Sequence, residues 1–248
     1  MDSDLVARYT RQMVLPAVGT DGQDSLSDSH VIVIGLGGLG CPAALYLATA
    51  GVGQLTLIDP DRVSLSNLPR QILYDEAQLG QYKVHAARTR LQALNHHTMI
   101  NTIAQALDRE ALQTQLAQAD LVLDCTDTFA SRDQINRASR HTVPLVSAAA
   151  IQWSYQVVLL NTDQYAPCYA CLFGQQGMDQ PDRCADLGVL GPVVGMAGSL
   201  QAGLALRYLL DNTIKPGLLS LFDLHTLSTQ TIQFKQDPHC PVCSITSL

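Results

Sequence analysis

Apolar runs and amphipathic stretches alternate along the first 150 residues of the chain. The run 31–34, Val-Ile-Val-Ile, has no polar position, which is typical of a strand buried on both faces of a parallel sheet. A glycine-rich turn at 35–40, an Ala- and Leu-rich stretch to about Ala50 and a second apolar run at 55–58 complete a βαβ unit. The alternation continues with predicted helices around 84–94, 109–118 and 131–141 and predicted strands at 99–103, 121–124 and 144–147.

This order of elements predicts an α/β fold built on a Rossmann-like, doubly wound and mostly parallel sheet. Beyond residue 150 the predicted strands 155–160, 218–222 and 229–234 lack regular intervening helices, which favours an antiparallel or mixed C-terminal extension. No internal repeat or long linker separates the parts, so we interpret residues 1–248 as one domain. Its three parts are an N-terminal helix region (1–29), a core (30–150) and a C-terminal part (151–248).

The segment 187–206 carries no charged residue and is long enough to span a membrane, with small residues spaced four apart. However, Gly and Pro punctuate its start, Gln201 interrupts it, and no topology signal flanks it. We therefore interpret it as a core helix that begins with Pro192 in its first turn and packs closely through its small residues.

The composition is typical of a globular protein, because 47% of the 248 residues are hydrophobic and 15% are charged. A formal net charge of −7 argues against a nucleic-acid partner, which requires clustered Lys and Arg. The first twenty residues mix charged and apolar positions and contain no signal-peptide pattern. We expect a cytoplasmic protein without a membrane partner.

A G-x-G-x-x-G pattern, formed by Gly35, Gly37 and Gly40, joins the first predicted strand to the helix after it. Glycines at these positions let the backbone approach a phosphate closely, and the helix N-terminus offers free N–H groups. Asp59 ends the next strand, where a carboxylate accepts hydrogen bonds from ribose hydroxyls. These features predict a nucleotide site, and taken alone they suit an NAD-dependent dehydrogenase equally well.

The residues that follow Asp59 favour ATP over NAD. Arg70 and Lys83 supply cations for a triphosphate and for a departing pyrophosphate, whereas the pyrophosphate bridge of NAD needs less charge. Asp127 follows the strand 121–124 and is placed to hold Mg²⁺. Since the carboxyl ends of parallel strands meet at one edge of a sheet, we expect these residues to converge on one crevice.

Two C-x-x-C pairs, Cys168 with Cys171 and Cys240 with Cys243, lie about seventy residues apart. Each such turn presents two thiolates, and two turns match one tetrahedral Zn²⁺. A closed zinc knuckle of this kind is structural, and it would pin the C-terminal tail to the middle of the chain. A redox dithiol is the weaker alternative, because neither pair has the βαβ context of a thioredoxin-like motif.

The three other cysteines differ in their surroundings. Cys41 at a helix start and Cys125 at a strand end are interpreted as small buried hydrophobes. Cys184 lies in the polar stretch 174–186, which we predict to be a mobile loop. An exposed cysteine without chemistry is the alternative to a reactive thiol at this position.

Together these motifs resemble those of the bacterial ThiF and MoeB proteins, relatives of the ubiquitin-activating enzymes. The resemblance spans nearly the whole chain. It rests on the glycine turn, both cysteine pairs and the runs Arg8-Tyr9-x-Arg11-Gln12, Asp59-x-Asp61, Ser66-Asn67-x-x-Arg70-Gln71, Lys83 and Asp124-Cys125-Thr126-Asp127. It implies ATP-dependent adenylation of the C-terminal Gly-Gly of a β-grasp sulfur-carrier protein, ThiS-like or MoaD-like, in thiamine or molybdopterin cofactor biosynthesis.

The resemblance also implies roles for single residues. It implies that Arg70 and Lys83 bind the phosphates and that Asp127 binds Mg²⁺. In ThiF-like members it also implies that Cys184 supplies a thiol that forms a covalent link to the carrier. Arg11 would reach the ATP site of the neighbouring subunit of a homodimer, which makes the N-terminal helix region an interface. The residues expected at the nucleotide are Gly35, Gly37, Gly38, Gly40, Asp59, Ser66, Asn67, Arg70, Lys83, Asp127 and Thr128.

Two positions depart from the family pattern: Thr128 stands where Asn is usual, and Pro69 where Gln is usual. Thr128 lacks an amide, and Pro69 fixes φ and lacks an N–H. A carrier-binding scaffold without turnover is therefore a second alternative beside the dehydrogenase. The runs 191–195 and 42–44 favour a ThiF-like over a MoeB-like protein, and the lack of a rhodanese-like extension implies that a separate protein donates the sulfur.

Overall fold

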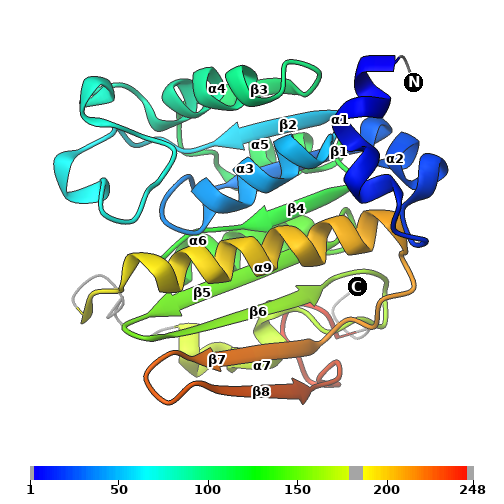
Figure 1. Cartoon of the computed structure of the whole chain (residues 1–248). Coiled ribbons are helices and arrows are strands. Elements are labelled where there is room, and N and C mark those ends of the chain that lie inside the picture. The colour runs from blue at the N-terminus through cyan, green and yellow to red at the C-terminus, as the bar shows by residue number, and fades with distance from the viewer. Residues whose placement is uncertain (1–2, 179–186, 245–248) are drawn as a thin grey trace.

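A mixed sheet of eight strands runs through the computed structural model, which describes residues 3–178 and 187–244 (Figure 1). The strands are β1 (His30–Ile34), β2 (Gln54–Ile58), β3 (Met99–Ile103), β4 (Leu121–Asp124), β5 (Leu145–Ile151), β6 (Ser154–Leu160), β7 (Leu218–Asp223) and β8 (Ser228–Gln233). The helices are α1 (Ser3–Met13), α2 (Gly19–Asp28), α3 (Gly40–Ala50), α4 (Lys83–Leu94), α5 (Arg109–Leu116), α6 (Phe129–Ser139), α7 (Tyr169–Met178) and α9 (Gly191–Leu210), with short 3-10 turns η1 (Leu65–Asn67) and η2 (Glu76–Gln78).

Five strands pair in parallel, in the order β3-β2-β1-β4-β5. The chain runs outward from β1 through β2 to β3 and then returns to place β4 on the other side of β1. The predicted doubly wound sheet is therefore confirmed. The strand order reverses between β1 and β4, and a crevice opens at the carboxyl ends of strands where such a reversal occurs.

Each face of the sheet packs against its own layer of helices (Figure 1). Val31 and Val33 belong to the core that includes α3, α4 and α9, whereas Ile32 belongs to the core that includes α5, α6 and α7. Successive side chains of a strand point to opposite faces, so one apolar run supplies both cores. This explains why the run has no polar position.

The C-terminal part extends the same sheet with antiparallel strands, as predicted. β5 continues to Ile151 instead of ending at 147, and the chain turns into β6 at Gln152 and Trp153. Gln152 has a φ of 52°, in the left-handed region that tight hairpin turns use. Because β5 crosses residue 150 without a break, the core and the C-terminal part share one sheet.

Two helices, α2 and α7, are absent from the sequence prediction. The α2 sequence contains two Gly and three Asp, which disfavour a helix interior. Tertiary contacts hold it, because Gln23 is fully buried and donates to the Ala50 carbonyl at 3.1 Å, and Leu26 is buried. α7 is kinked at Gly174, where φ is 64° and ψ is 176°, and its second helical segment occupies the start of the stretch predicted to be a loop. The rest of that stretch, 179–186, lies outside the described residues.

α9 has the length and apolar composition to cross a membrane, and in the described part of the chain no other helix does. In this structure it lies across β4, β5 and β6 and packs against α3 (Figure 1). A Cβ on Gly198 would lie 2.2 Å from the Leu39 carbonyl oxygen, so glycine is required at this contact. Gln201 is fully buried and donates to the carbonyls of Asp124 and Val146, each at 2.9 Å. α9 is thus the core helix predicted, with Pro192 in its first turn.

Candidate functional site

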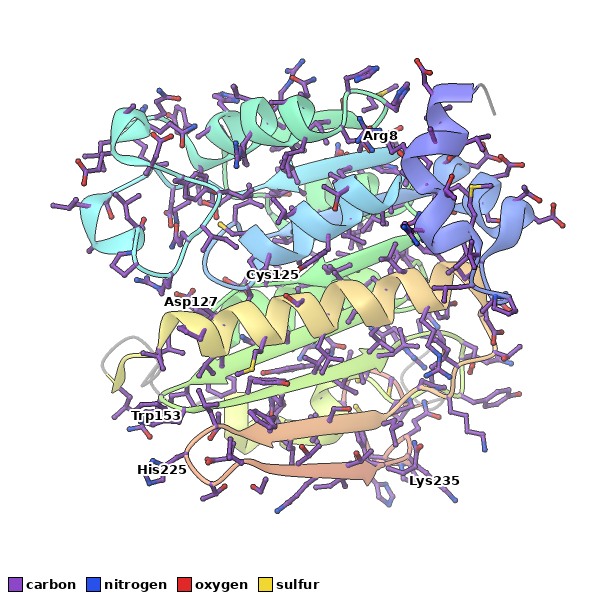
Figure 2. All side chains as sticks on the ribbon, viewed as in Figure 1. Arg8, Cys125, Asp127, Trp153, His225 and Lys235 are labelled. Carbon is purple, nitrogen blue, oxygen red and sulfur yellow. The ribbon has the colours of Figure 1, made fainter. Side chains whose placement is uncertain are left out.

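A cavity of about 820 Å³ opens at the carboxyl ends of β1, β2 and β4, within the size range of small-molecule sites. Figure 2 marks Cys125 and Asp127 at this end of the molecule. The residues of the sequence prediction that line the cavity are Gly35, Gly37, Gly38, Asp59, Asn67, Arg70, Lys83 and Asp127. Gly40, Ser66, Thr128 and Arg11 lie outside its lining.

The glycine turn leaves no space for a side chain at three positions, against the Val194 side chain at Gly38 and against backbone atoms at the other two. Gly35 has a φ of 88°, and a Cβ there would lie 2.8 Å from the carbonyl oxygen of Cys125. A Cβ on Gly40 would lie 1.9 Å from the carbonyl oxygen of Gly35. Gly37 differs, because its Cβ would meet only Gln71 Nε2, at 3.7 Å. Gly35 and Gly40 therefore permit close backbone packing, whereas Gly37 keeps the cavity open.

Asp59 ties the end of β2 to the glycine turn. Its carboxylate accepts the N–H of Leu36 at 2.6 Å on one oxygen and the N–H of Asp61 at 2.8 Å on the other. Burial raises the pKa of Asp59, while the charge of Lys83 and the two amides act in the opposite direction. Each carboxylate oxygen has a second lone pair, which a ribose hydroxyl can use.

Two cations border the same cavity. Lys83 opens α4 and is buried, with its Nζ 2.7 Å from Asp61 Oδ2. Asp61 is 64% exposed, so this ion pair lies at the rim, where a phosphate group can compete for the ammonium. Arg70 is half-buried, and its planar guanidinium matches the geometry of phosphate oxygens.

The segment between β2 and α4 explains how Pro69 is accommodated. Asn67 lines the cavity, whereas Ser66 is exposed and lies outside it. The Asn67 carbonyl accepts the N–H of Arg70 at 3.1 Å, a bond that needs no N–H at Pro69. The Ser66 carbonyl accepts Arg70 Nη1 at 3.0 Å. Pro69 therefore interrupts neither of these two hydrogen bonds.

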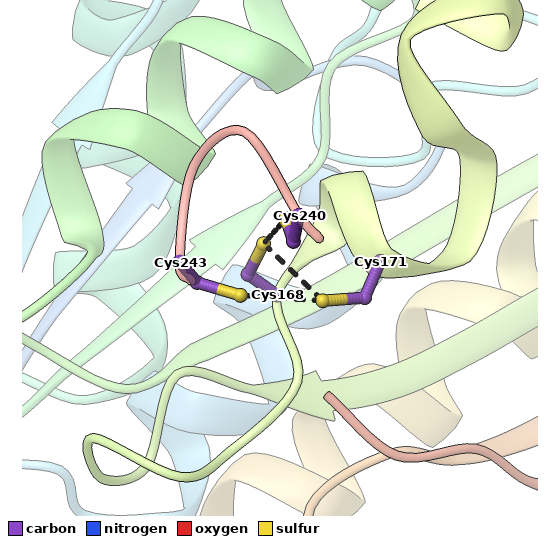
Figure 3. A group of neighbouring side chains, drawn as sticks. All are labelled: Cys168, Cys171, Cys240 and Cys243. Carbon is purple, nitrogen blue, oxygen red and sulfur yellow. Dashed lines mark hydrogen bonds between the residues drawn. The ribbon is translucent and has the colours of Figure 1, made fainter. Parts of the chain in front are cut away.

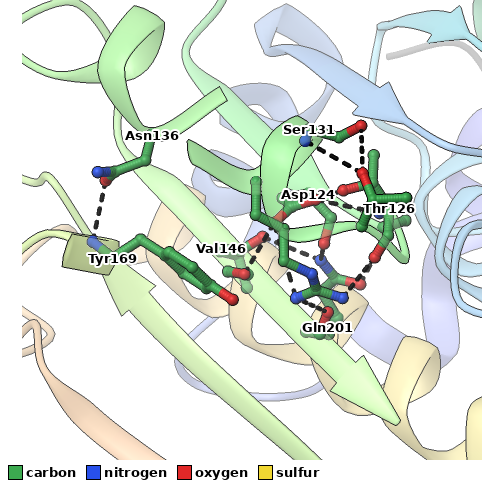
Figure 4. A network of polar contacts seen from close by, with 12 residues as sticks. Asp124, Thr126, Ser131, Asn136, Val146, Tyr169 and Gln201 are labelled. Atoms are coloured by element: carbon green, nitrogen blue, oxygen red, sulfur yellow. Dashed lines mark hydrogen bonds and ion pairs between the residues drawn. The ribbon is translucent and has the colours of Figure 1, made fainter. Parts of the chain in front are cut away.

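A buried polar network holds the segment that follows β4 (Figure 4). Asp124 is 1% exposed and accepts the N–H and hydroxyl of Thr126, at 3.0 and 2.7 Å, and the Ser147 hydroxyl at 2.9 Å. Arg132 of α6 lies 3.9 Å from the Asp124 carboxylate and donates to the carbonyls of Thr126 and Ala148. The backbone immediately before the predicted Mg²⁺ ligand is therefore fixed from two sides.

Thr128 serves as the N-cap of α6. Its hydroxyl accepts the N–H of Ser131 at 3.1 Å and donates to the Ser131 hydroxyl at 2.8 Å. The cap starts α6 at Phe129, two residues before the predicted start at 131. Asp127, directly before the cap, is exposed in the cavity. The substitution of Thr for the usual Asn retains a capping function at this position.

The cavity continues past these residues beneath the β5–β6 hairpin. Ala149 and Ala150 give this wall small side chains. Tyr169 and Phe173 of α7 stack with ring centroids 4.6 Å apart and line the same extension. Alanine and aromatic side chains thus make this part of the lining largely apolar.

α1 lies at the opposite edge of the molecule from the cavity (Figure 1). Tyr9 is buried, with its hydroxyl accepting Asn95 Nδ2 at 2.8 Å, and Arg8 donates to the Leu94 carbonyl at 3.0 Å. These contacts fix the helix on the molecule while Arg11 is exposed. Arg11 therefore belongs to a helix that does not border the cavity of its own chain.

The four cysteines of the two C-x-x-C pairs gather into one cluster (Figure 3). Their Sγ atoms all lie within 4.8 Å of one another, with Cys171 and Cys243 3.3 Å apart and Cys168 and Cys240 3.6 Å apart. Tetrahedral Zn²⁺ with Zn–S bonds of about 2.3 Å requires sulfurs roughly 3.8 Å apart. A hydrogen bond with Cys168 lowers the pKa of Cys171 to about 5, and the Asp237 N–H also reaches this sulfur at 3.4 Å. A hydrogen bond with Cys171 raises the pKa of Cys168, and burial raises the pKa of Cys243 to about 12. The spacing of the four sulfurs is therefore the feature that fits a zinc ion.

The other cysteines fall into two groups. Burial raises the pKa of Cys41 to about 12 and raises that of Cys125 well above its usual value, so both thiols stay protonated at neutral pH. This agrees with their interpretation as buried hydrophobes. Cys184 lies outside the described residues.

Sequence reasoning missed Arg132 and Gln201 as site residues. Arg132 was detectable, because the buried positions of α6 include Arg132, Ile135, Asn136 and Ser139, which follow helical spacing. A charged residue on an otherwise buried helix face signals a specific buried partner. Gln201 gave no such signal for Asp124, because the two lie 77 residues apart in the chain.

The model of the ThiF family matches residues 9–242. The molybdopterin-synthase adenylyltransferase of Escherichia coli (strain K12) is 43% identical over 242 residues, which cover 95% of each protein. The sulfur carrier protein ThiS adenylyltransferase of the same strain is also 43% identical, over 95% of this chain and 94% of the relative. Equal identities do not separate the two subfamilies.

A mosquito protein and a solved structure extend the comparison. The adenylyltransferase and sulfurtransferase MOCS3 of Culex quinquefasciatus is 39% identical over 98% of this chain, which spans 56% of that protein. The crystal structure of E. coli MccB with ATP has a TM-score of 0.81 at 23% identity, over 96% of this chain and 74% of that one. The latter likeness shows a shared fold.

Substitution of Gly40, which packs against backbone, and of Gly37, which borders the cavity, should have different effects on folding and on ATP binding. Gly40→Ala forces a Cβ into the Gly35 carbonyl, and we expect it to lower the free energy of unfolding by about 4 kcal/mol or to prevent folding. Gly37→Ala should fold normally and weaken ATP binding, because its methyl group enters the cavity. Urea unfolding and calorimetric ATP titration measure the two effects. Equal stability losses for both variants would contradict this assignment.

Proposed function

Because the chain belongs to the ThiF family, we propose that it binds ATP in the cavity and adenylates the C-terminal carboxylate of a small sulfur-carrier protein, releasing pyrophosphate. The observation that carries the proposal is the convergence of Asp59, Arg70, Lys83 and Asp127 on one cavity. The adenylyltransferase names of the 43% identical relatives favour this reading over a dehydrogenase. A scaffold that has lost turnover is disfavoured, because these charged residues are all retained.

In the proposed reaction the glycine turn and Asp59 hold the nucleoside, and Arg70 and Lys83 hold the phosphates. The carrier carboxylate attacks the α-phosphorus, and the bond from that phosphorus to the oxygen bridging it to the β-phosphate breaks. Asp127 would hold Mg²⁺, which would supply charge neutralisation to the phosphate groups when bound. Arg70 and Lys83 stabilise the negative charge that moves onto the departing pyrophosphate.

The carrier tail would enter through the extension beneath the β5–β6 hairpin. The small side chains of Ala149 and Ala150 on this wall suit a Gly-Gly terminus, which has no side chains of its own to place. A ThiS-like or a MoaD-like carrier fits this description equally well. Sulfur transfer onto the adenylate would follow with a separate donor protein, and Cys184 is proposed to act at that later stage.

We further propose that the chain works as a homodimer in the cytoplasm. Arg11 is exposed on a helix that does not border its own cavity, so it can contribute to catalysis only at the site of a second copy. The core position of α9 fits a protein that does not enter the membrane. The cysteine cluster is proposed to hold one structural Zn²⁺, which leaves no coordination position for substrate.

Exchange of label between ATP and pyrophosphate tests the adenylation proposal. We expect exchange only with a carrier that ends in Gly-Gly, and at least a hundredfold loss in Arg70→Ala and Asp127→Ala, because both stabilise the transition state. The affinity of both variants for AMP should fall by a smaller factor than the rate of exchange. Arg88→Ala, an exposed position of α4, is the control. Tight ATP binding without exchange for either carrier class would favour the scaffold.

Metal analysis tests the cysteine cluster. We expect one zinc per chain, and Cys168→Ser should lose it and lower Tm by more than about 5 °C, since metal binding contributes to folding. ATP affinity should be unchanged. Cys41→Ala, a buried position outside the cluster, should keep its zinc. A stably folded wild-type protein without metal would refute the structural zinc.

Mixing variants tests whether Arg11 acts across the dimer. Arg11→Ala and Arg70→Ala should each be inactive alone, but a heterodimer of the two has one intact site. Random reassociation should restore roughly a quarter of wild-type exchange, because half the dimers are mixed and each has one working site. Arg70→Ala mixed with Asp127→Ala should restore none if Arg70 and Asp127 serve the same subunit's site. Failure of the first mixture alone would remove Arg11 from the partner's site.

A further inference from the structure

Arg132 makes contacts that exceed what helix packing requires. It lies on the buried face of α6 and is 6% exposed. Its Nη1 donates to the Ala148 carbonyl at 2.9 Å, its Nη2 donates to the Thr126 carbonyl, and the Asp124 carboxylate lies 3.9 Å away. Burying a guanidinium is costly, and an apolar side chain of similar volume would pack as well. A specific use of the charge and of its forked geometry is therefore indicated.

The contacts fix one peptide group. The Thr126 N–H donates to Asp124 Oδ1 at 3.0 Å, and the Thr126 carbonyl accepts from Arg132. Because the peptide bond is planar, holding this carbonyl also sets the backbone nitrogen of Asp127. On the other side, Thr128 is fixed as the N-cap of α6. Asp127 is thus held between two anchored residues while its carboxylate lies in the cavity.

We propose that Arg132 is a positioning residue that presents the Asp127 carboxylate to Mg²⁺·ATP. The proposal rests on the proposed function only in taking Asp127 as the group that meets the metal. Arg132 joins the middle of β5, through Ala148, to the turn after β4, through Thr126. It therefore sets the carboxylate in place before nucleotide arrives, which avoids an ordering cost on binding.

Variants of Arg132 and of a neighbour on the same helix separate this role from packing. Arg132→Lys keeps the charge beside Asp124, but a single ammonium cannot fork to two carbonyls. Arg137, five residues further along α6, pairs with Asp133 at 2.8 Å and is only partly buried. Arg137→Lys makes the same chemical change without touching the turn, and is the matched control.

ATP binding is measured by calorimetry with Mg²⁺ and with EDTA. We expect Arg132→Lys to reduce the Mg²⁺-dependent gain in ATP affinity at least tenfold and to change affinity in EDTA less than twofold. Arg137→Lys should match wild type in both. In an Asp127→Asn background, Arg132→Lys should have no further effect on the Mg²⁺-dependent gain, because the first substitution removes the group being positioned. Equal losses with Mg²⁺ and EDTA, or additive losses in the double variant, would overturn the proposal.

Hydrogen exchange on the ligand-free wild-type protein gives a readout that needs no variant to fold. We expect the amides of Cys125 and Thr126, which donate to the Ile34 carbonyl and to Asp124, to be protected without nucleotide and to gain little protection from Mg²⁺·ATP. Ordering of this turn only on binding would refute pre-positioning. Absence of label exchange between ATP and pyrophosphate in the wild-type protein would instead refute adenylation. The calorimetric ATP affinities and the amide hydrogen-exchange protection would still decide the role of Arg132.

Discussion

The site depends on the close approach of the turn after β1 to the end of β4. Gly35 and Gly40 make this approach sterically possible, since a Cβ on either would overlap a carbonyl oxygen. With the turn held this close, the Leu36 N–H reaches the carboxylate at the end of β2, at 2.6 Å. The ends of three strands are thereby joined by backbone packing and one short hydrogen bond. The cavity is the space that this arrangement leaves above the strands.

The sequence predicted those parts of the fold and of the candidate site that depend on residues close together in the chain. The run 31–34 specifies a strand buried on both faces because its residues alone carry the pattern, and the spacing of each cysteine pair is equally local. α2 was not predictable, since its sequence disfavours a helix and contacts such as that of Gln23 with Ala50 hold it. Likewise, the partners of Gln201 lie 55 and 77 residues away, and no sequence period reports them. The glycine turn and the charged residues at the strand ends were enough to predict where the cavity lies. The buried residues that hold its walls, such as Gln201, could be identified only from the three-dimensional structure.

α6 connects the two chemical centres of the molecule. Its N-cap follows Asp127, and further along the helix the Asn136 side chain accepts the Tyr169 N–H at 2.9 Å. Tyr169 is the residue after Cys168, so one helix contacts both the turn after β4 and the start of the cysteine cluster (Figures 3 and 4). A buried arginine near one end of this helix, Arg132, and another after its last residue, Arg140, bind backbone carbonyls. The helix thus anchors loops at both ends.

The order of elements along the chain also has a consequence for synthesis on the ribosome. α9 is apolar enough to be hazardous if exposed, yet the strands it covers, β4, β5 and β6, and its helix neighbour α3 all precede it in the chain. Its burial surface is therefore complete before it emerges, and co-translational folding can proceed from the N-terminus without leaving this helix waiting for a partner. Cys240 and Cys243 follow β8 in the chain. The cysteine cluster can therefore close only after every strand of the described sheet has been synthesised.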